Sequence, residues 1–299
     1  MSQPRDAERG VAADGGRGRL VLVPTPIGNL EDMTLRGLRA LREADLIACE
    51  DTRHSRRLLE HFQIQRPTVS FHQHNEAART AELLERLLAG QVIALISDAG
   101  TPGISDPGER LVRAAVARGV AVEALPGASA LLPALIASGL PAAPFSFAGF
   151  LPARSGERRG ALDAWGRRAE TVIFYEAPHR LQATLADLVE MLGPDRQLVV
   201  ARELTKLHEE FRRGSAAEVA AHFAADPPLG ECVLLLAPYR GEALPTAATE
   251  LADRIRTLLQ APGADERHVL RQVARERGLD RSEVFRRWQA AQRCDRNGR

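Results

Sequence analysis

Short apolar runs alternate with longer amphipathic segments from Arg19 to about Ser138. The amphipathic segments, such as MTLRGLRALREA and AARTAELLERLLAG, have the spacing of apolar positions that is typical of helices. The apolar runs have the length of strands and read LVLVP, DLIACE, TVSFH, VIALIS and AVEAL. This alternation predicts a mostly parallel sheet covered by helices, in which binding sites lie at the carboxyl ends of the strands.

A different pattern follows the proline-rich stretch Pro141–Pro152. Its expected strands lie closer together and read SFAGF, TVIFYE, QLVVARE, EFRRG and ECVLLLA. Helical segments are expected around Arg158–Arg168, up to Gly193 and up to Ala225. Closely spaced strands predict a mixed sheet. The expected fold class is therefore α/β, with two α/β domains.

The same patterns predict the domain boundaries. Residues 1–18 are polar, glycine-rich and charged, without the apolar core that a secretory signal needs, and we expect a disordered lead. The first α/β domain is expected at 19–140 and the second at 141–240. The linker GEALPTAAT then precedes two or three amphipathic helices, which form a basic helical extension at 250–299.

One uncharged stretch, Ala124–Ala153, is long enough to span a bilayer. It contains five prolines, which are incompatible with a continuous hydrogen-bonded helix. We interpret the stretch as buried domain core plus a linker, and expect no membrane association.

Charge and cysteine content narrow the class of protein. Across 299 residues, 40 Lys and Arg almost cancel 39 Asp and Glu, so no global field points to nucleic acid or to an anionic membrane. Residues 250–299 hold twelve arginines against eight acidic residues and form the local basic element. Three cysteines, far apart and in no CxxC pair, argue against a disulfide framework and a zinc site. We expect a reducing, cytoplasmic setting.

The loop Ser97–Gly108, SDAGTPGISDPG, is the most informative stretch for chemistry. It follows an apolar strand, and its glycines and prolines leave main-chain groups open to a close ligand while its aspartates can accept hydrogen bonds. It is neither a Walker loop nor GxGxxG, which favours a nucleoside ligand with few phosphates. The loops Pro24–Leu30 and Leu125–Ala130 follow two other strands of the same sheet, so all three should open on one edge and form a cleft.

The chain also resembles a known family through eight ordered motifs between Arg19 and Pro238. They are PTPIGNLEDMTLR, EDTR, HQHNE, SDAGTPGISDPG, LPGASA, YEAPHR, RELTKLHEE and GECVLLLAP. This combination resembles the ribosomal RNA small subunit methyltransferase I family of the tetrapyrrole methylase superfamily. The resemblance implies two α/β domains of tetrapyrrole-methylase type with a cleft between them for the methyl donor, S-adenosylmethionine. It also implies 2′-O-methylation of a cytidine ribose in the decoding region of 16S rRNA, within the 30S subunit.

By resemblance, the donor-binding residues are drawn from the strand-end loops and from one strand of the second domain. They are Pro24, Asp98, Ala99, Gly100, Thr101, Ser129, Ala130 and Cys232. The family resemblance and the uncharged surface expected in the second domain together suggest a homodimer.

Methyl transfer from an activated sulfonium requires mainly alignment of the ribose hydroxyl and removal of its proton. The main candidates for this step are Glu176, His179, Glu203 and Lys206, with His72, His74 and Glu76 as further ones. Lys206 stands apart because it is the only lysine in the chain. A site that uses a compact ammonium, or one that can lose its proton, cannot use guanidinium in its place. A surface position without function is the alternative.

Other readings stay open. His72 and His74 could face a metal, but no third ligand stands at a diagnostic spacing, and we expect none. Asp51 and Arg53 are expected to shape the cleft or to contact RNA. The arginines between Arg154 and Arg168 could grip phosphates or form a solvated helix face. The alternative functions are methylation of a small, tetrapyrrole-like molecule and a non-catalytic role as an RNA-binding assembly factor.

Overall fold

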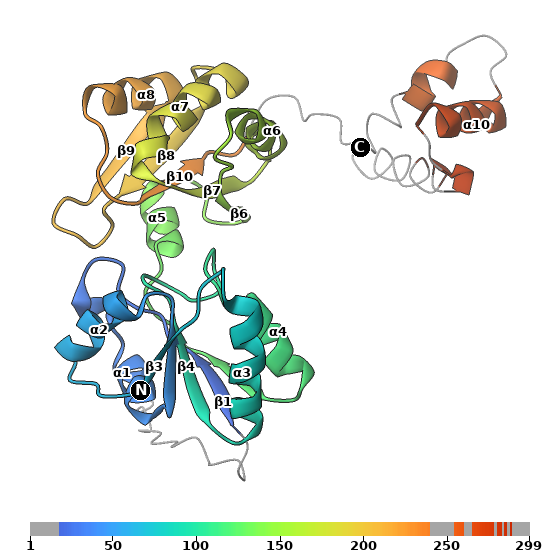
Figure 1. Cartoon of the computed structure of the whole chain (residues 1–299). Helices are drawn as coiled ribbons and strands as arrows, with labels where there is room; N and C mark the ends of the chain where they lie inside the picture. The colour runs from blue at the N-terminus through green and yellow to red at the C-terminus, as the bar shows by residue number, and fades with distance from the viewer. Residues whose placement is uncertain are drawn as a thin grey trace, which may run out of the picture. The chain divides into compact units, whose positions relative to one another are not determined.

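The computed structural model describes residues 18–239, 254–259, 265–277, 280–282, 284–285 and 288. The chain forms two compact units, one that ends at Pro238 and one that begins at Tyr239. The first unit contains both expected sheets, each built from consecutive strands (Figure 1). The exact domain boundaries remain a prediction.

The first sheet is entirely parallel, with strand order β3-β2-β4-β1-β5. Its strands are β1 (Arg19–Leu22), β2 (Leu46–Cys49), β3 (Thr68–Ser70), β4 (Val92–Ile96) and β5 (Ala121–Ala124). Between them lie the 3-10 helix η1 (Leu30–Asp32) and the helices α1 (Leu35–Glu43), α2 (Thr52–His61), α3 (Glu76–Leu88) and α4 (Glu109–Ala117). The predicted parallel sheet is confirmed.

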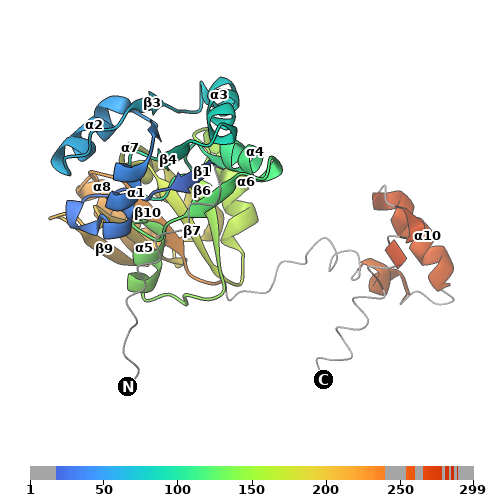
Figure 2. The same ribbon diagram turned by 90° about the horizontal axis from the view of Figure 1, so that it is seen from below.

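Helices cover both faces of the first sheet. Leu41 of α1 and Leu59 of α2 are buried with Ile47 of β2 on one face. Leu83 of α3 and Leu111 of α4 are buried on the other face. Figures 1 and 2 show α1 and α2 on one side of the sheet and α3 and α4 on the opposite side. This arrangement leaves the carboxyl ends of the strands as the edge where loops can form a site.

The second sheet is mixed, with strand order β6-β7-β10-β8-β9. Only β6 and β7 pair in parallel, and the other neighbours are antiparallel. The strands are β6 (Phe145–Phe150), β7 (Thr171–Glu176), β8 (Gln197–Arg202), β9 (Glu210–Ser215) and β10 (Cys232–Leu236). The predicted mixed sheet is also confirmed.

The two faces of the second sheet are covered unequally. The helices α6 (Ser155–Gly166), α7 (Pro178–Leu192) and α8 (Ala216–Ala225) pack on one face through a large apolar cluster. On the other face lies the short helix α5 (Leu131–Ser138), whose Leu131 and Leu135 pack against β7, β8 and β10. The uncharged stretch Ala124–Ala153 thus supplies α5 and β6, and only part of it is buried: Leu131 and Leu135 lie in the core, whereas Leu132 and Ile136 are exposed. Among the described residues, no helix combines the length and apolar composition needed to cross a bilayer.

The second unit has a small core of its own. Residues 254–259 are helical and α10 spans Glu266–Arg277. Val269 and Val273 of α10 are buried with Ile255, Val284 and Trp288, and the Trp288 indole Nε1–H donates to Glu266 Oε1 at 2.6 Å. The helical character expected for 250–299 is therefore seen in its described part, whereas residues 1–17 of the expected lead lie outside the described residues.

Candidate active site

Three loops at the carboxyl edge of the first sheet are bound directly to one another. Thr25 and Gly100 exchange two backbone hydrogen bonds of 2.9 Å each, which joins the loop after β1 to the loop after β4. The Thr25 hydroxyl also donates to Ser97 O, and the Thr101 hydroxyl donates to Ala128 O, both at 3.0 Å. The expectation that these loops converge is therefore confirmed.

A cavity of about 380 Å³ lies between this edge and the second sheet. Its volume falls in the range of small-molecule sites, about 300–1,000 Å³. Its lining comprises Ile27, Glu50, Asp98, Ala99, Gly100, Thr101, Ile104, Ser105, Asp106, Ser129, Ala130, Phe150, Tyr175, Glu176, Glu203, Leu204, Lys206, Glu231, Cys232 and Val233.

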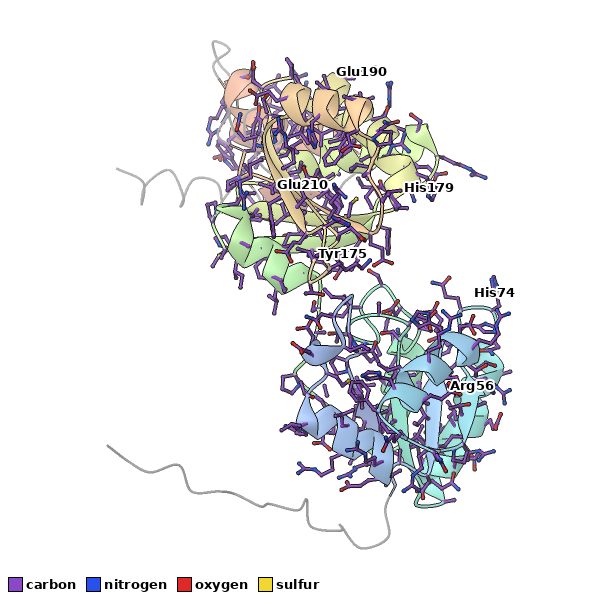
Figure 3. All side chains as sticks on the ribbon, turned by 90° about the vertical axis from the view of Figure 1, so that its left-hand side faces the viewer. Arg56, His74, Tyr175, His179, Glu190 and Glu210 are labelled. Carbon is purple, nitrogen blue, oxygen red and sulfur yellow. The ribbon has the colours of Figure 1, made fainter. Side chains whose placement is uncertain are left out.

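Almost all of the sequence-predicted site residues line this cavity. Pro24 and His179 do not. Pro24 is buried beneath the lining, where its side chain occupies the space that a side chain at Gly127 would need. His179 is exposed in the first turn of α7, and Figure 3 shows it on the outer flank of that helix. The roles assigned to the lining residues remain proposals.

The lining is strongly acidic. It includes six acidic side chains and, within the described part of the chain, a single basic one, Lys206. Asp98 is fixed by the Asp51 backbone N–H, which donates to its Oδ1 at 3.1 Å. Burial and the neighbouring charge of Glu50 raise the pKa of Asp106 to about 7, and burial likewise raises the pKa of Glu50. An interior with this charge favours a cationic ligand.

Lys206 is held in position by residues from both sheets. Its Nζ lies 2.7 Å from Glu203 Oε1 in an ion pair. A Cβ at Gly28 would lie 2.4 Å from Cγ of Lys206, so the lysine stem packs on the bare backbone of the loop after β1. Glu203 has a positive φ of 52° and occupies space that a side chain at Gly230 would need. A strained turn is therefore maintained at the cavity.

Glu176 has a different environment from Glu203. Its side chain is fully buried, and its carboxylate accepts hydrogen bonds from the Thr184 hydroxyl at 2.6 Å and from the Ala177 N–H at 2.9 Å. Arg180 Nε lies 3.2 Å away. These contacts tie the first two turns of α7 to the end of β7 at the cavity wall.

Aromatic side chains form another part of the cavity wall. The Tyr175 ring contacts Phe147 and Phe150 edge to face, at centroid distances of 4.9 and 5.6 Å. Burial raises the pKa of Tyr175, and its hydroxyl is hydrogen-bonded to the Ser129 side chain. Burial also raises the pKa of the Cys232 thiol to about 12, so Cys232 contributes an uncharged, unreactive surface. Aromatic and apolar walls of this kind suit a purine or pyrimidine ring.

Sequence reasoning did not single out Glu50, Tyr175, Phe150 or Glu231, all of which line the cavity. Three of them lie inside motifs that were recognised: Glu50 in EDTR, Tyr175 in YEAPHR and Glu231 in GECVLLLAP. Their position at strand ends was the available signal. Nothing in the pattern shows that Phe150 and Glu231, 81 residues apart, reach the same space.

Several other candidates lie outside the cavity lining. Glu76 Oε1 accepts a hydrogen bond from the Gly108 N–H at 3.1 Å and so anchors the end of the Ser97–Gly108 loop. The His72 and His74 rings lie 6.0 Å apart, centroid to centroid. The described residues contain no group of three His, Cys, Asp or Glu side chains arranged to hold a metal. The Asp51 side chain caps α2 and pairs with Arg53 at 3.2 Å.

Comparison with known proteins identifies the family. The model for Tetrapyrrole (Corrin/Porphyrin) Methylases matches residues 19–220. The protein from Synechocystis named ribosomal RNA small subunit methyltransferase I is 49% identical over 269 residues, which cover 90% of this chain and 96% of that protein. The protein of the same name from Streptococcus pyogenes serotype M1 is 43% identical over 270 residues, 90% and 93% of the two chains. The chain belongs to the ribosomal RNA small subunit methyltransferase I family. The resemblance expected from the motifs is thereby confirmed.

Solved structures share the fold of this family member. Uroporphyrin-III-C-methyltransferase from Thermus thermophilus has a TM-score of 0.52 at 24% identity, covering 74% of this chain and 94% of that chain. Diphthine synthase has a TM-score of 0.56 at 17% identity, covering 73% and 90%. Another structure of the Thermus enzyme, complexed with S-adenyl homocysteine, has a TM-score of 0.51 at 20% identity and covers 73% and 96%. The predicted tetrapyrrole-methylase fold is confirmed.

Proposed function

We propose that this protein is an S-adenosylmethionine-dependent methyltransferase that modifies the 2′-oxygen of a cytidine ribose in the decoding region of 16S rRNA. The main support is an acidic, partly aromatic cavity formed by residues next to both sheets. The chain that forms it has relatives named ribosomal RNA small subunit methyltransferase I. The cytidine and the 2′-oxygen rest on the resemblance of the motifs.

The cavity fits the donor by charge and by surface. When bound, S-adenosylmethionine supplies a methyl group from a sulfonium, and the molecule carries a net positive charge. Six acidic side chains and one lysine surround this space, which favours such a cation over its thioether product, whose net charge is zero. The carboxylates of the lining offer hydrogen-bond acceptors, and the ring of Tyr175 offers a flat apolar surface to a nucleoside.

The acceptor side is proposed to be formed by Glu203 and Lys206. A ribose hydroxyl that attacks a methyl carbon must lose its proton as the new bond to oxygen forms. The Glu203 carboxylate can accept this proton, and the Lys206 ammonium, 2.7 Å from it, can stabilise the negative charge that develops on the hydroxyl oxygen. Glu176 has no free role of this kind because Thr184 and Ala177 occupy its oxygens. His179 would have to act from outside the cavity lining.

The test is transfer of labelled methyl groups to 30S subunits, followed by mapping of the modified nucleotide by mass spectrometry. Ribosomes from cells that carry Asp98→Ala should lack one specific 2′-O-methyl group that wild-type ribosomes have. Asp98→Asn is the matched control for folding, because its amide oxygen can still accept from the Asp51 N–H while the negative charge is lost. It should fold normally and still bind the donor weakly.

The same assay separates the two alternatives. Transfer to porphyrinoids but not to 30S subunits would establish a small-molecule methyltransferase. Ribosome methylation that is unchanged in Asp98→Ala cells would favour a non-catalytic RNA-binding assembly factor. Absence of any calorimetric heat with S-adenosylmethionine or its demethylated product, up to millimolar concentration, would remove the methyltransferase proposal. A ribosomal substrate would also place the protein in the cytoplasm, as its cysteine pattern suggests.

A further inference from the structure

Because the cavity is acidic, an RNA substrate would need positive charge on the protein surface around it. RNA carries one negative charge per phosphate, and protein affinity for it comes largely from Lys and Arg side chains on the backbone. The cavity lining, with its single lysine paired to Glu203, cannot provide these contacts. If the substrate is RNA, as the proposed function holds, a cationic surface must lie outside the cavity and close to it.

The arginines of α6 do not meet this requirement. Arg154 pairs with Glu157, Arg167 with Asp163 and Arg168 with Glu170, at 3.3, 3.2 and 3.9 Å. Arg158 and Arg159 both contact Asp187. Each guanidinium in or next to this helix thus already has a carboxylate beside it, which offsets the attraction to a phosphate. Of the two alternatives for this segment, the contacts favour a solvated helix face over phosphate binding.

Helix α2 has the opposite character. Its buried side consists of Ser55 and Leu59, and its exposed side includes Arg53, Arg56 and Arg57. Arg53 pairs with its own helix cap, Asp51. Within residues 18–239 and the described part of the second unit, neither Arg56 nor Arg57 has an ion-pair or hydrogen-bond partner. In Figure 3, Arg56 lies on the outside of the part of the molecule built on the first sheet, on the same side as His74.

The position of α2 ties it to the cavity. The helix begins at Thr52, two residues after the cavity residue Glu50. The N–H of the intervening Asp51 donates to Asp98 in the Ser97–Gly108 loop, so the start of α2 and this loop are held together. Arg56 and Arg57 follow in the next turn of the helix, and both are exposed.

We propose that this α2 surface, formed by Arg56 and Arg57, binds the phosphodiester backbone of the RNA next to the nucleotide that enters the cavity. The proposal rests on the proposed function. It assigns separate roles to neighbouring parts of the segment that joins β2 to α2: Glu50 faces the cationic donor, and the arginines that follow bind the polyanionic acceptor.

The experiment compares two pairs of adjacent, solvent-accessible arginines. Arg56→Ala/Arg57→Ala removes unpaired cations, and the matched control Arg167→Ala/Arg168→Ala removes paired ones. Binding to 30S subunits and to a 16S rRNA fragment is measured by filter binding at several salt concentrations. The α2 variant should bind about 10-fold more weakly, and the slope of log affinity against log salt should fall by about 1 for each arginine. The α6 variant should stay close to the wild type.

Two further measurements isolate the role of α2. Calorimetric affinity for S-adenosylmethionine should be unchanged in the α2 variant, and methyl transfer should show a raised KM for RNA with kcat retained at saturation. Arg56→Lys/Arg57→Lys should restore most of the binding, because a point charge suffices for a phosphate contact.

The outcomes distinguish this inference from the function on which it rests. A wild-type protein that neither binds nor methylates ribosomal RNA would overturn the proposed function. An active wild type whose α2 variant binds RNA with unchanged affinity and salt slope would overturn the α2 surface alone. Equal losses in the α2 and α6 variants would also reject it, because the effect would then come from net charge.

Discussion

At the scale of single residues, Lys206 provides the most direct test of the chemistry. It is the only lysine in the chain, its ammonium pairs with Glu203, and its stem packs on Gly28. Arginine keeps the charge but is planar, longer and unable to lose its proton. Lys206→Arg should therefore lower methyl transfer to 30S subunits at least ~10-fold.

The control for this variant is donor affinity, which should stay nearly constant in calorimetry. Equal rates for Lys206→Arg and wild type, measured below saturating RNA, would remove Lys206 from the mechanism. Glu203→Gln, which keeps the shape of the side chain but removes the carboxylate, would then be the next variant to compare.

The raised pKa of Asp106 predicts that donor binding depends on pH. Burial and the charge of Glu50 raise its pKa to about 7, so part of the population is protonated at neutral pH. A cationic donor favours the ionised carboxylate, and binding should therefore release a proton and become tighter as the pH rises from 6 to 8. Calorimetry in buffers of different ionisation enthalpy measures the released proton directly. Asp106→Asn should abolish this release and flatten the profile, whereas a wild-type affinity that is constant from pH 6 to 8 would contradict the prediction.

The same shift has a consequence for stability. The pKa of Asp106 is higher in the folded protein than its ordinary value, so its contribution to stability is fully present below pH 4 and is lost as the pH rises through about 7. Denaturant titrations should show that Asp106→Asn, relative to wild type, gains stability between pH 5 and pH 8. A constant difference between the two proteins across this range would mean that Asp106 is not destabilised by ionisation.

At the scale of structural elements, substitutions at two glycines test whether packing between two turns holds Glu203 in position. Gly230 and Gly119 have similar positive φ values, 73° and 70°. A Cβ at Gly230 would lie 1.5 Å from Glu203 Oε1, whereas a Cβ at Gly119 would meet nothing within 4 Å. Alanine at either position strains the backbone by about 1 kcal/mol, but only Gly230→Ala must also displace Glu203.

Gly119→Ala should lower the free energy of unfolding by about 1 kcal/mol and leave methyl transfer unchanged. Gly230→Ala should lose a similar amount of stability and, in addition, at least ~10-fold in kcat, because Glu203 and Lys206 move together. Chemical denaturation and methyl-transfer kinetics on the same preparations separate the two effects. Equal activity of the two variants would show that the position of Glu203 is unimportant.

The elements themselves were largely predictable, because their signals are local. Most strands in the described part of the chain correspond to apolar runs in the sequence, β9 with its sequence EFRRGS being the exception, and the pairing of parallel strands follows from the helices between them. The convergence of the loops after β1, β4 and β5 also followed, since carboxyl ends of parallel strands share an edge. The approach of Glu231, which precedes β10 of the second sheet, could not be predicted, because no local pattern encodes contacts between the two sheets.

The sequence also could not predict which charged side chains pair with one another. The arginines of α6 and α2 look alike in composition, yet Asp187 and Glu190 of α7 pair with Arg158 and Arg159, whereas no carboxylate of the described residues pairs with Arg56 or Arg57. Glu176 and Glu203 were equivalent candidates, and only their hydrogen-bond partners separate a positioning carboxylate from one that faces the cavity beside a lysine. Chemistry at this site depends on long-range packing.

At the scale of the whole molecule, an apolar surface on α5 supports the proposed homodimer. Leu131 and Leu135 of this helix face the second sheet, but Leu132 and Ile136, four residues apart, are 52% and 73% exposed on another face. Burial of such side chains against a second copy would remove apolar surface from water, and an isologous contact would bring the two α5 helices together.

Light scattering at micromolar concentration should therefore give about 65 kDa, twice the chain mass of 32.6 kDa. Leu132→Glu/Ile136→Glu should shift the particle to the monomer mass, because two like charges would face each other across the two-fold axis. Val116→Glu is the matched control, since Val116 of α4 is 62% exposed and lies on the first sheet's side of the fold. A wild-type particle of monomer mass would reject the dimer. A dimer that survives Leu132→Glu/Ile136→Glu would place its interface elsewhere, because a pair of charges at the centre of an apolar contact costs far more than the contact contributes.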